Sequence, residues 1–233
     1  MPPVPHGYGG VMSALDAPAH ALASAGGLLF AGTTRAVAAV RPAAKPLHPR
    51  GEVTRGRLFR RGAQPATGVP WLDETGEDDV LVRRSRAIGL PGSAPDIHGL
   101  AIRVPRPGGG HGDLLLASTG WGRLTRFVLT MSRSPRQRPM TTLLPYRTDR
   151  GPLLLGARPT GAESFELAAA APEGEWARFA ELRLSALPLD DDADDPAVSF
   201  DPVVNRLPGL EQYGAVERLR EPSYRSARGS RTE

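Results

Sequence analysis

The 233-residue sequence contains no cysteine. This absence excludes disulfide bonds, thiol catalysis and thiolate metal sites, although it does not decide the compartment. Only one lysine (Lys45) and one asparagine (Asn205) are present, and aromatic residues make up 6% of the chain. Because so few aromatic side chains are available, we expect a core built mainly from leucine, alanine and valine.

Long hydrophobic runs are also missing. The most apolar stretch, residues 17–32, is rich in alanine and glycine and is interrupted by His20 and Ser24. It is too weakly apolar for a transmembrane helix. No positively charged region precedes it, which argues against a signal peptide. We therefore expect a cytoplasmic protein without a membrane partner.

Positive charge is carried almost entirely by arginine. The formal net charge is +4 and the sequence pI is about 10.1. This bias has two interpretations, a GC-rich coding sequence or affinity for anions and nucleic acid. The arginines are scattered among acidic residues with few aromatics between them. The pattern therefore does not favour a nucleic-acid partner.

Glycine and proline are abundant, with 27 and 24 residues, and they favour many turns over long helices. Leu100, Ile102 and Val104 alternate with more polar neighbours, as expected for an antiparallel strand with one buried face. Similar short segments between turns predict eight strands. Their ranges are 56–61, 80–86, 99–105, 112–118, 152–157, 164–170, 180–187 and 198–205. Eight strands suffice to close a barrel, so we predict a β-rich α+β fold with an eight-stranded antiparallel β-barrel and peripheral helices.

Helical patterns are short and lie outside these strands. Residues 17–25 and 34–40 favour two helices within an N-terminal arm, residues 1–45. The spacing of Leu124, Phe127, Val128 and Met131 predicts a further helix, which the following prolines would end.

Two charged runs are interpreted as solvated loops, the basic residues 133–138 and the acidic residues 190–195. Asp96 and His98 have the spacing of a two-residue metal-binding motif, but no third ligand is evident. A turn role for Asp96 is the favoured interpretation.

Several short motifs occur together in this order. His48-Pro49-Arg50-Gly51 is followed by Gly56 and Leu58. The later segments are Val82-Arg83-Arg84-Ser85, the run from Asp96 to Val104, Asp113-Leu114, and a pair formed by Arg220 and Tyr224. Together these islands resemble the haem-site framework of catalases, in the form of a short, reduced, bacterial catalase-related protein. The resemblance implies a catalase-like barrel domain over residues 46–224, a C-terminal tail over 225–233, and an N-terminal arm of a kind that can support a homo-oligomer.

The resemblance also implies a role for each site residue. His48 would be the distal acid–base, because a histidine near neutral pKa can shuttle the proton that peroxide cleavage requires. Ser85 would orient it, and Arg83 would pair with a carboxylate of haem b. Tyr224 would bind the haem iron as a phenolate, and Arg220 would favour that anionic form.

Two departures from the family pattern bear on activity. The position of the catalase distal asparagine falls on Ala117 or Ser118, and no asparagine lies nearby. Pro222 lies between Arg220 and Tyr224, where its ring conflicts with a continuous helix. We therefore expect a haem peroxidase or hydroperoxide-transforming enzyme with weak or no true catalase activity.

Two non-enzymatic alternatives stay open. The same cavity would serve a haem carrier or sensor. A degenerate barrel without catalysis would instead bind another small molecule or a protein partner.

Overall fold

The computed structural model describes residues 50–89, 94–188 and 198–214. His48, Arg220 and Tyr224, the two N-terminal helices and the acidic residues 190–195 lie outside these ranges. The strands are β1 (Arg50–Arg61), β2 (Thr75–Arg86), β3 (His98–Pro105), β4 (His111–Ser118), β5 (Met140–Thr141), β6 (Tyr146–Thr148), β7 (Gly151–Pro159), β8 (Ser164–Ala170) and β9 (Ala177–Pro188). Two short helical segments accompany them, α2 (Pro70–Asp73) and a 3-10 turn, η1 (Thr125–Phe127).

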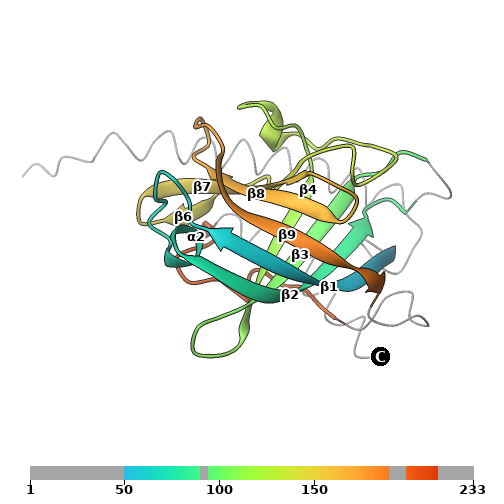
Figure 1. Cartoon of the computed structure of the whole chain (residues 1–233). Coiled ribbons are helices and arrows are strands. Elements are labelled where there is room, and N and C mark those ends of the chain that lie inside the picture. The colour runs from blue at the N-terminus through green and yellow to red at the C-terminus, as the bar shows by residue number, and fades with distance from the viewer. Residues whose placement is uncertain (1–49, 90–93, 189–197, 215–233) are drawn as a thin grey trace, which may run out of the picture.

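The strands form a closed antiparallel barrel (Figure 1). Their order is β5-β4-β3-β2-β1-β9-β8-β7-β6, and a further pairing between β5 and β7 closes the ring. The prediction of an eight-stranded antiparallel barrel is therefore confirmed, with β6 attached outside the ring to β7. Strand bounds differ from the prediction at both β1 and β2, which extend further toward their polar ends.

Alternating side chains fill the barrel, as the period of two predicted. Leu100, Ile102 and Val104 on β3 are exposed by 1% or less, and they share one core with Val82 on β2 and Leu182 on β9. Both strand partners of β2 contribute to this interior. The inner face of the sheet is therefore the face that carries Val82.

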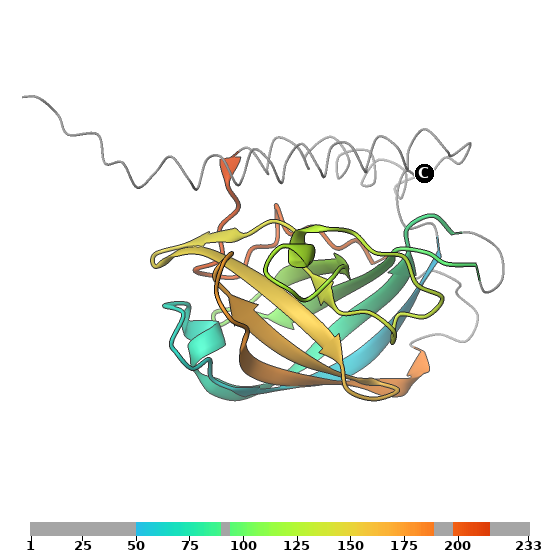
Figure 2. The same ribbon diagram turned by 90° about the horizontal axis from the view of Figure 1, so that it is seen from above.

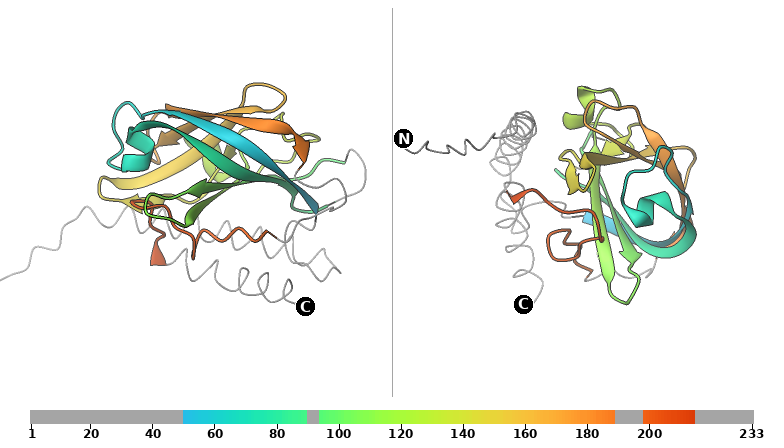
Figure 3. Two further views of the ribbon diagram at one scale, coloured as in Figure 1. Left: turned by 60° about the horizontal axis from the view of Figure 1, so that its bottom comes forward. Right: turned by 90° about the vertical axis from the view of Figure 1, so that its left-hand side faces the viewer.

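The two ends of the barrel differ. Helix α2 lies across one end (Figure 3), where Trp71 and Leu72 are buried in the same core. Residues 198–214 run along one side of the barrel in the view from above (Figure 2).

Among the described residues, no helix is both long and apolar enough to cross a bilayer.

The predicted helix at residues 124–131 is wrong. Only Thr125–Phe127 form a single 3-10 turn, and Leu124 and Val128 are 84% and 51% exposed. Beyond the turn the backbone is extended, because Leu129 and Ser132 form bridges with other segments of the chain. The apolar side chains that have helical spacing therefore have no apolar surface against which a helix could pack.

The predicted strand at residues 198–205 is also wrong. This segment is irregular, and its backbone is held by a side chain of the barrel. Asp113 on β4 accepts hydrogen bonds from the backbone N–H of Asp201 and from Asn205 Nδ2, each at 2.8 Å. A buried carboxylate therefore replaces the strand ladder as the anchor of this segment.

Candidate functional site

Two motifs that suggested a haem site become neighbours in the barrel. Strands β1 and β2 are antiparallel, with Gly51 opposite Ser85 and Val53 opposite Arg83. Side chains alternate along β2, so Arg83 and Ser85 share one face, and Val82 lies on the other. Because Val82 is fully buried in the core, Arg83 and Ser85 belong to the outer face of the barrel wall.

Arg83 lies against the backbone of the neighbouring strand. A β-carbon added to Gly51 would lie only 2.6 Å from Arg83 Cζ and 2.7 Å from its Nε and Nη2. The guanidinium therefore lies over Gly51, in space that only a glycine leaves open. Arg83 is 7% exposed, and an arginine keeps its charge when it is buried.

The described residues fit the carboxylate end of a haem group. Haem carries carboxylates that need a cation, and Arg83 offers a buried guanidinium with the Ser85 hydroxyl on the same face. The proposed iron ligand Tyr224 and its companions His48 and Arg220 lie outside the described residues. Within the described ranges, no group of three or more histidine or carboxylate side chains is arranged to hold a bare metal ion.

Asp96 organises a turn, as the favoured interpretation predicted. Its carboxylate is fully buried and accepts hydrogen bonds from the backbone N–H groups of Ile88, Gly89 and Ile97, each at 2.8 Å. Arg86 Nε lies 3.3 Å from the same carboxylate. These contacts occupy the oxygen atoms that a metal ion would need.

His98 is likewise a structural residue. It is 4% exposed, and its Nε2 donates a hydrogen bond to the backbone oxygen of Ser132 at 2.9 Å. A carbonyl oxygen only accepts, so Nε2 carries the proton. The arrangement disfavours the alternative in which Asp96 and His98 share a metal ion.

The position expected for a distal asparagine holds Ala117 or Ser118, and only Ser118 has a polar side chain. Ser118 Oγ donates a hydrogen bond to the Thr130 backbone oxygen at 2.6 Å and accepts one from the His98 backbone N–H at 3.0 Å. Its hydroxyl therefore ties β3 and β4 to the loop that follows, and both contacts are internal to the protein.

A pocket of about 510 Å³ lies beside this region, at the end of the barrel away from α2, because Gly51 and Arg86 lie at the ends of β1 and β2 that are remote from that helix. Eight of its ten lining residues are polar or charged. The lining residues are Gly51, Glu52, Arg84, Ser85, Arg86, His98, Arg133, Ser134, Pro135 and Arg136. Arg84 and Arg86 follow Val82 in the alternation of β2, so they belong to the inner face, opposite Arg83.

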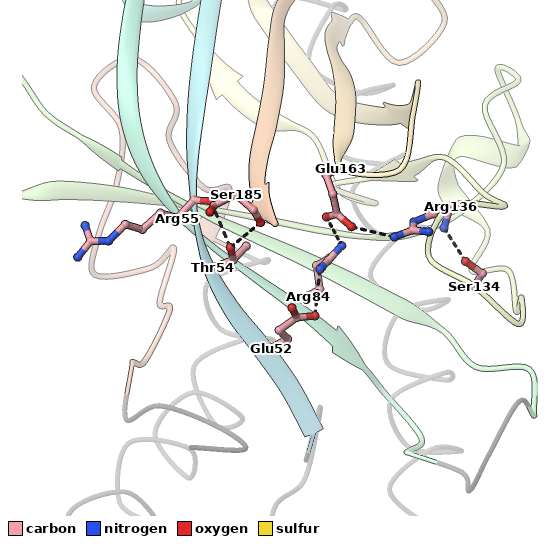
Figure 4. A network of polar contacts seen from close by, with 8 residues as sticks. All are labelled: Glu52, Thr54, Arg55, Arg84, Ser134, Arg136, Glu163 and Ser185. Atoms are coloured by element: carbon pink, nitrogen blue, oxygen red, sulfur yellow. Dashed lines mark hydrogen bonds and ion pairs between the residues drawn. The ribbon is translucent and has the colours of Figure 1, made fainter. Parts of the chain in front are cut away.

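A series of ion pairs links Glu52 on β1, through Arg84 and Glu163, to Arg136 (Figure 4). Arg84 donates from Nη1 to Glu163 at 2.7 Å and from Nη2 to Glu52 at 3.0 Å. Arg136 donates from Nη2 to the second oxygen of Glu163 at 2.8 Å. The Arg84 and Glu163 side chains are 15% and 28% exposed, so the ion pair between them is partly shielded from water.

Sequence reasoning missed this pocket. It treated residues 133–138 as a solvated loop and gave Arg84 no role. The structure places Arg133 and Arg136 at the pocket and leaves Arg138 exposed outside the lining. The sequence did contain an indication of a basic site, because residues 114–148 contain six arginines and no acidic residue.

No protein-family model matches the chain, and no curated protein sequence matches it. Solved structures do match, among them the crystal structure of a fungal catalase at 1.9 Å, with a TM-score of 0.60 and 14% identity. The match covers 83% of this chain and 60% of the catalase chain, so this protein spans less than two thirds of that catalase. The comparison establishes that the chain has a catalase-like β-barrel fold.

Proposed function

We propose that this chain is a small catalase-fold haem protein, a peroxidase or hydroperoxide-transforming enzyme with weak or no true catalase activity. The observation that carries the proposal is the register of β1 and β2, which joins Gly51, Arg83 and Ser85 on one outer face. Two motifs separated by about thirty residues of sequence thus form one surface, which supports the proposal.

Each residue has a distinct task in this proposal. Arg83 neutralises a haem carboxylate, since its buried guanidinium is a permanent cation. The Ser85 hydroxyl orients the imidazole of His48, and that imidazole takes and returns the proton of a bound peroxide. Tyr224 is the iron ligand, and Arg220 favours its phenolate form. When bound, haem b supplies the iron at which the peroxide O–O bond is cleaved.

Neither residue at the distal asparagine position favours catalase chemistry: Ala117, on the face of Ser85, has no polar side-chain group, and Ser118 lies on the opposite, inner face. Ser118 directs its hydroxyl to Thr130 and receives the backbone N–H of His98. Its polar atom is therefore already used within the protein. We expect proton transfer to rely on His48 alone, which lowers the rate of peroxide dismutation.

A second candidate is a barrel that binds a small molecule without catalysis. The specific observation in its favour is the pocket of about 510 Å³ at the end of β2, which Arg84 and Arg86 line. Its volume lies in the range typical of small-molecule sites.

Haem reconstitution of the full chain tests the primary proposal. The wild type is expected to bind haem b at a 1:1 ratio with a high-spin ferric spectrum, and Tyr224→Phe is expected to lose that spectrum. Arg83→Gln is expected to weaken haem binding about tenfold, whereas the exposed control Arg138→Gln leaves it unchanged. Circular dichroism of each variant confirms that the barrel is folded.

Peroxide turnover then tests the enzymatic part. His48→Ala is expected to reduce peroxide consumption about a hundredfold while the haem spectrum stays. If the wild type does not take up haem stoichiometrically, the proposal fails. If haem binds and His48→Ala retains full turnover, the haem assignment stands and the proposed catalytic role of His48 is wrong.

A further inference from the structure

We propose that the pocket at the end of the barrel away from α2 binds a small oxyanion, a phosphate ester or a carboxylate. The inference concerns the arginines that line this pocket and does not rest on haem binding. It rests on the charge, composition and exposure of the lining side chains.

Among the residues that the structure describes, the charges around the pocket do not cancel. Four arginines line it, namely Arg84, Arg86, Arg133 and Arg136. Three carboxylates pair with them, Glu52 and Glu163 with Arg84, Glu163 also with Arg136, and Asp96 with Arg86. Four fixed cations against three carboxylates leave a positive surplus, which favours an anionic occupant.

Arg133 is the cation that supplies this surplus. Within the described ranges no carboxylate forms an ion pair with its guanidinium, and its backbone N–H is held by Gln137 Oε1 at 3.1 Å. The loop therefore holds the backbone of Arg133 and leaves its guanidinium group available to a ligand. The planar guanidinium can donate two parallel hydrogen bonds to two oxygens of a phosphate or a carboxylate.

Arg136 can serve as a second ligand-binding arm. Its side chain is 50% exposed, and among the described residues its one ion pair is with Glu163, which already pairs with the less exposed Arg84. Exposed ion pairs contribute little to the free energy of folding. An entering oxyanion therefore replaces Glu163 at Arg136 at a small cost, while Arg84 keeps both of its carboxylates.

The composition of the lining selects against a purely apolar ligand. Only Gly51 and Pro135 among the ten lining residues are nonpolar. Ser134 adds a hydroxyl group beside the guanidinium groups. The pocket thus matches a compact polar anion better than an extended hydrocarbon.

Calorimetric titration of the full chain tests the proposal, with inorganic phosphate and succinate as separate probes in a chloride buffer of constant ionic strength. We expect saturable binding at one site. Phosphate binding alone assigns the pocket to phosphoryl ligands, and binding of both probes assigns it to oxyanions in general. The experiment requires no haem, so it succeeds or fails independently of the proposed function.

Variants locate the binding. Arg133→Gln and Arg136→Gln are each expected to weaken the better probe about tenfold, and the matched control Arg138→Gln, on the same loop but outside the lining, less than twofold. Glu163→Gln is expected to strengthen binding several-fold, because it removes the carboxylate that competes for Arg136. Absence of saturable binding, or equal weakening by Arg138→Gln, would overturn the proposal.

Discussion

The guanidinium of Arg83 lies over the α-carbon of Gly51 on the neighbouring strand, close enough that a β-carbon there would lie 2.6 Å from Arg83 Cζ. The contact joins two motifs that are far apart in the sequence. It also explains why a glycine precedes the body of β1, since any larger residue would displace the cation.

Gly51→Ala is therefore expected to weaken haem binding several-fold while changing the free energy of unfolding by only about 1 kcal/mol. The small cost follows because the group that must move is the end of a flexible side chain. Haem titration and urea unfolding of the same preparation measure the two effects.

Gly62→Ala is the matched comparison. Gly62 has φ +81°, and a β-carbon there would lie 2.5 Å from the backbone oxygen of Asp73. Backbone cannot move aside as easily, so we expect a loss of about 2–4 kcal/mol. Equal losses in the two variants would show that Arg83 is not free to rearrange.

The carboxylate of Asp96 holds the turn between β2 and β3, and its removal is expected to be costly. Asp96→Ala leaves three buried N–H groups without their acceptor and Arg86 without its carboxylate. We expect the free energy of unfolding to fall by about 3–5 kcal/mol. Asp96→Asn keeps one acceptor oxygen and is expected to lose less. Urea unfolding checks the order, and a loss below about 1 kcal/mol for Asp96→Ala would contradict it.

Asp113 anchors residues 198–205 to the barrel. It pairs with Arg103 through both oxygens, at 2.8 and 2.9 Å, and it also accepts hydrogen bonds from Asp201 and Asn205. Asp113→Ala is expected to cost about 3–5 kcal/mol and to speed hydrogen exchange at the Asp201 amide, because that amide loses its acceptor.

Asp79→Ala serves as the control for Asp113. Asp79 is 82% exposed and pairs with Arg57 at 3.0 Å, so its removal is expected to cost less than about 1 kcal/mol. Unchanged exchange at Asp201 in Asp113→Ala would mean that the segment is held by other contacts.

The barrel was predictable from the sequence because each strand is marked by the alternation of apolar and polar residues within a few neighbouring positions. Alternation such as that of Leu100, Ile102 and Val104 identifies a strand with one buried face, and seven of the eight predicted segments are strands of the ring. The eighth strand is the two-residue β5, which is too short to show alternation. The same kind of pattern misled at residues 124–131. Helical spacing shows which side chains would share a face, but it does not show whether a core exists beneath that face, and Leu124 is 84% exposed.

The pocket was not predictable because its charges meet only through the fold. Arg84 and Glu163 are 79 positions apart in the sequence, and the barrel closure brings them together. Arg83 and Arg84 are neighbours in sequence, yet they serve opposite faces of one strand. The catalase resemblance identified the outer face and carried no information about the inner one.

Tyr213 provides a prediction for alkaline pH. Its ring packs against Leu143 and Leu144, and burial raises the pKa of its phenol above the ordinary value of 10.0, an effect that the charge of Arg147 partly opposes. The folded state thus holds this proton more tightly than the unfolded chain. The stability that Tyr213 contributes is complete below about pH 10 and is lost as the pH rises through the folded pKa.

Tyr213→Phe cannot ionise, so we expect it to match the wild type near neutral pH and to lose less stability above about pH 10. Urea unfolding of both proteins at neutral pH and at about pH 10.5 measures the difference, and the ultraviolet absorbance of tyrosinate follows the ionisation directly. Parallel losses in the two proteins would show that the Tyr213 phenol titrates as freely in the folded state as in the unfolded chain. In that case the contact of its ring with Leu143 and Leu144 would not restrict the access of water to its hydroxyl group.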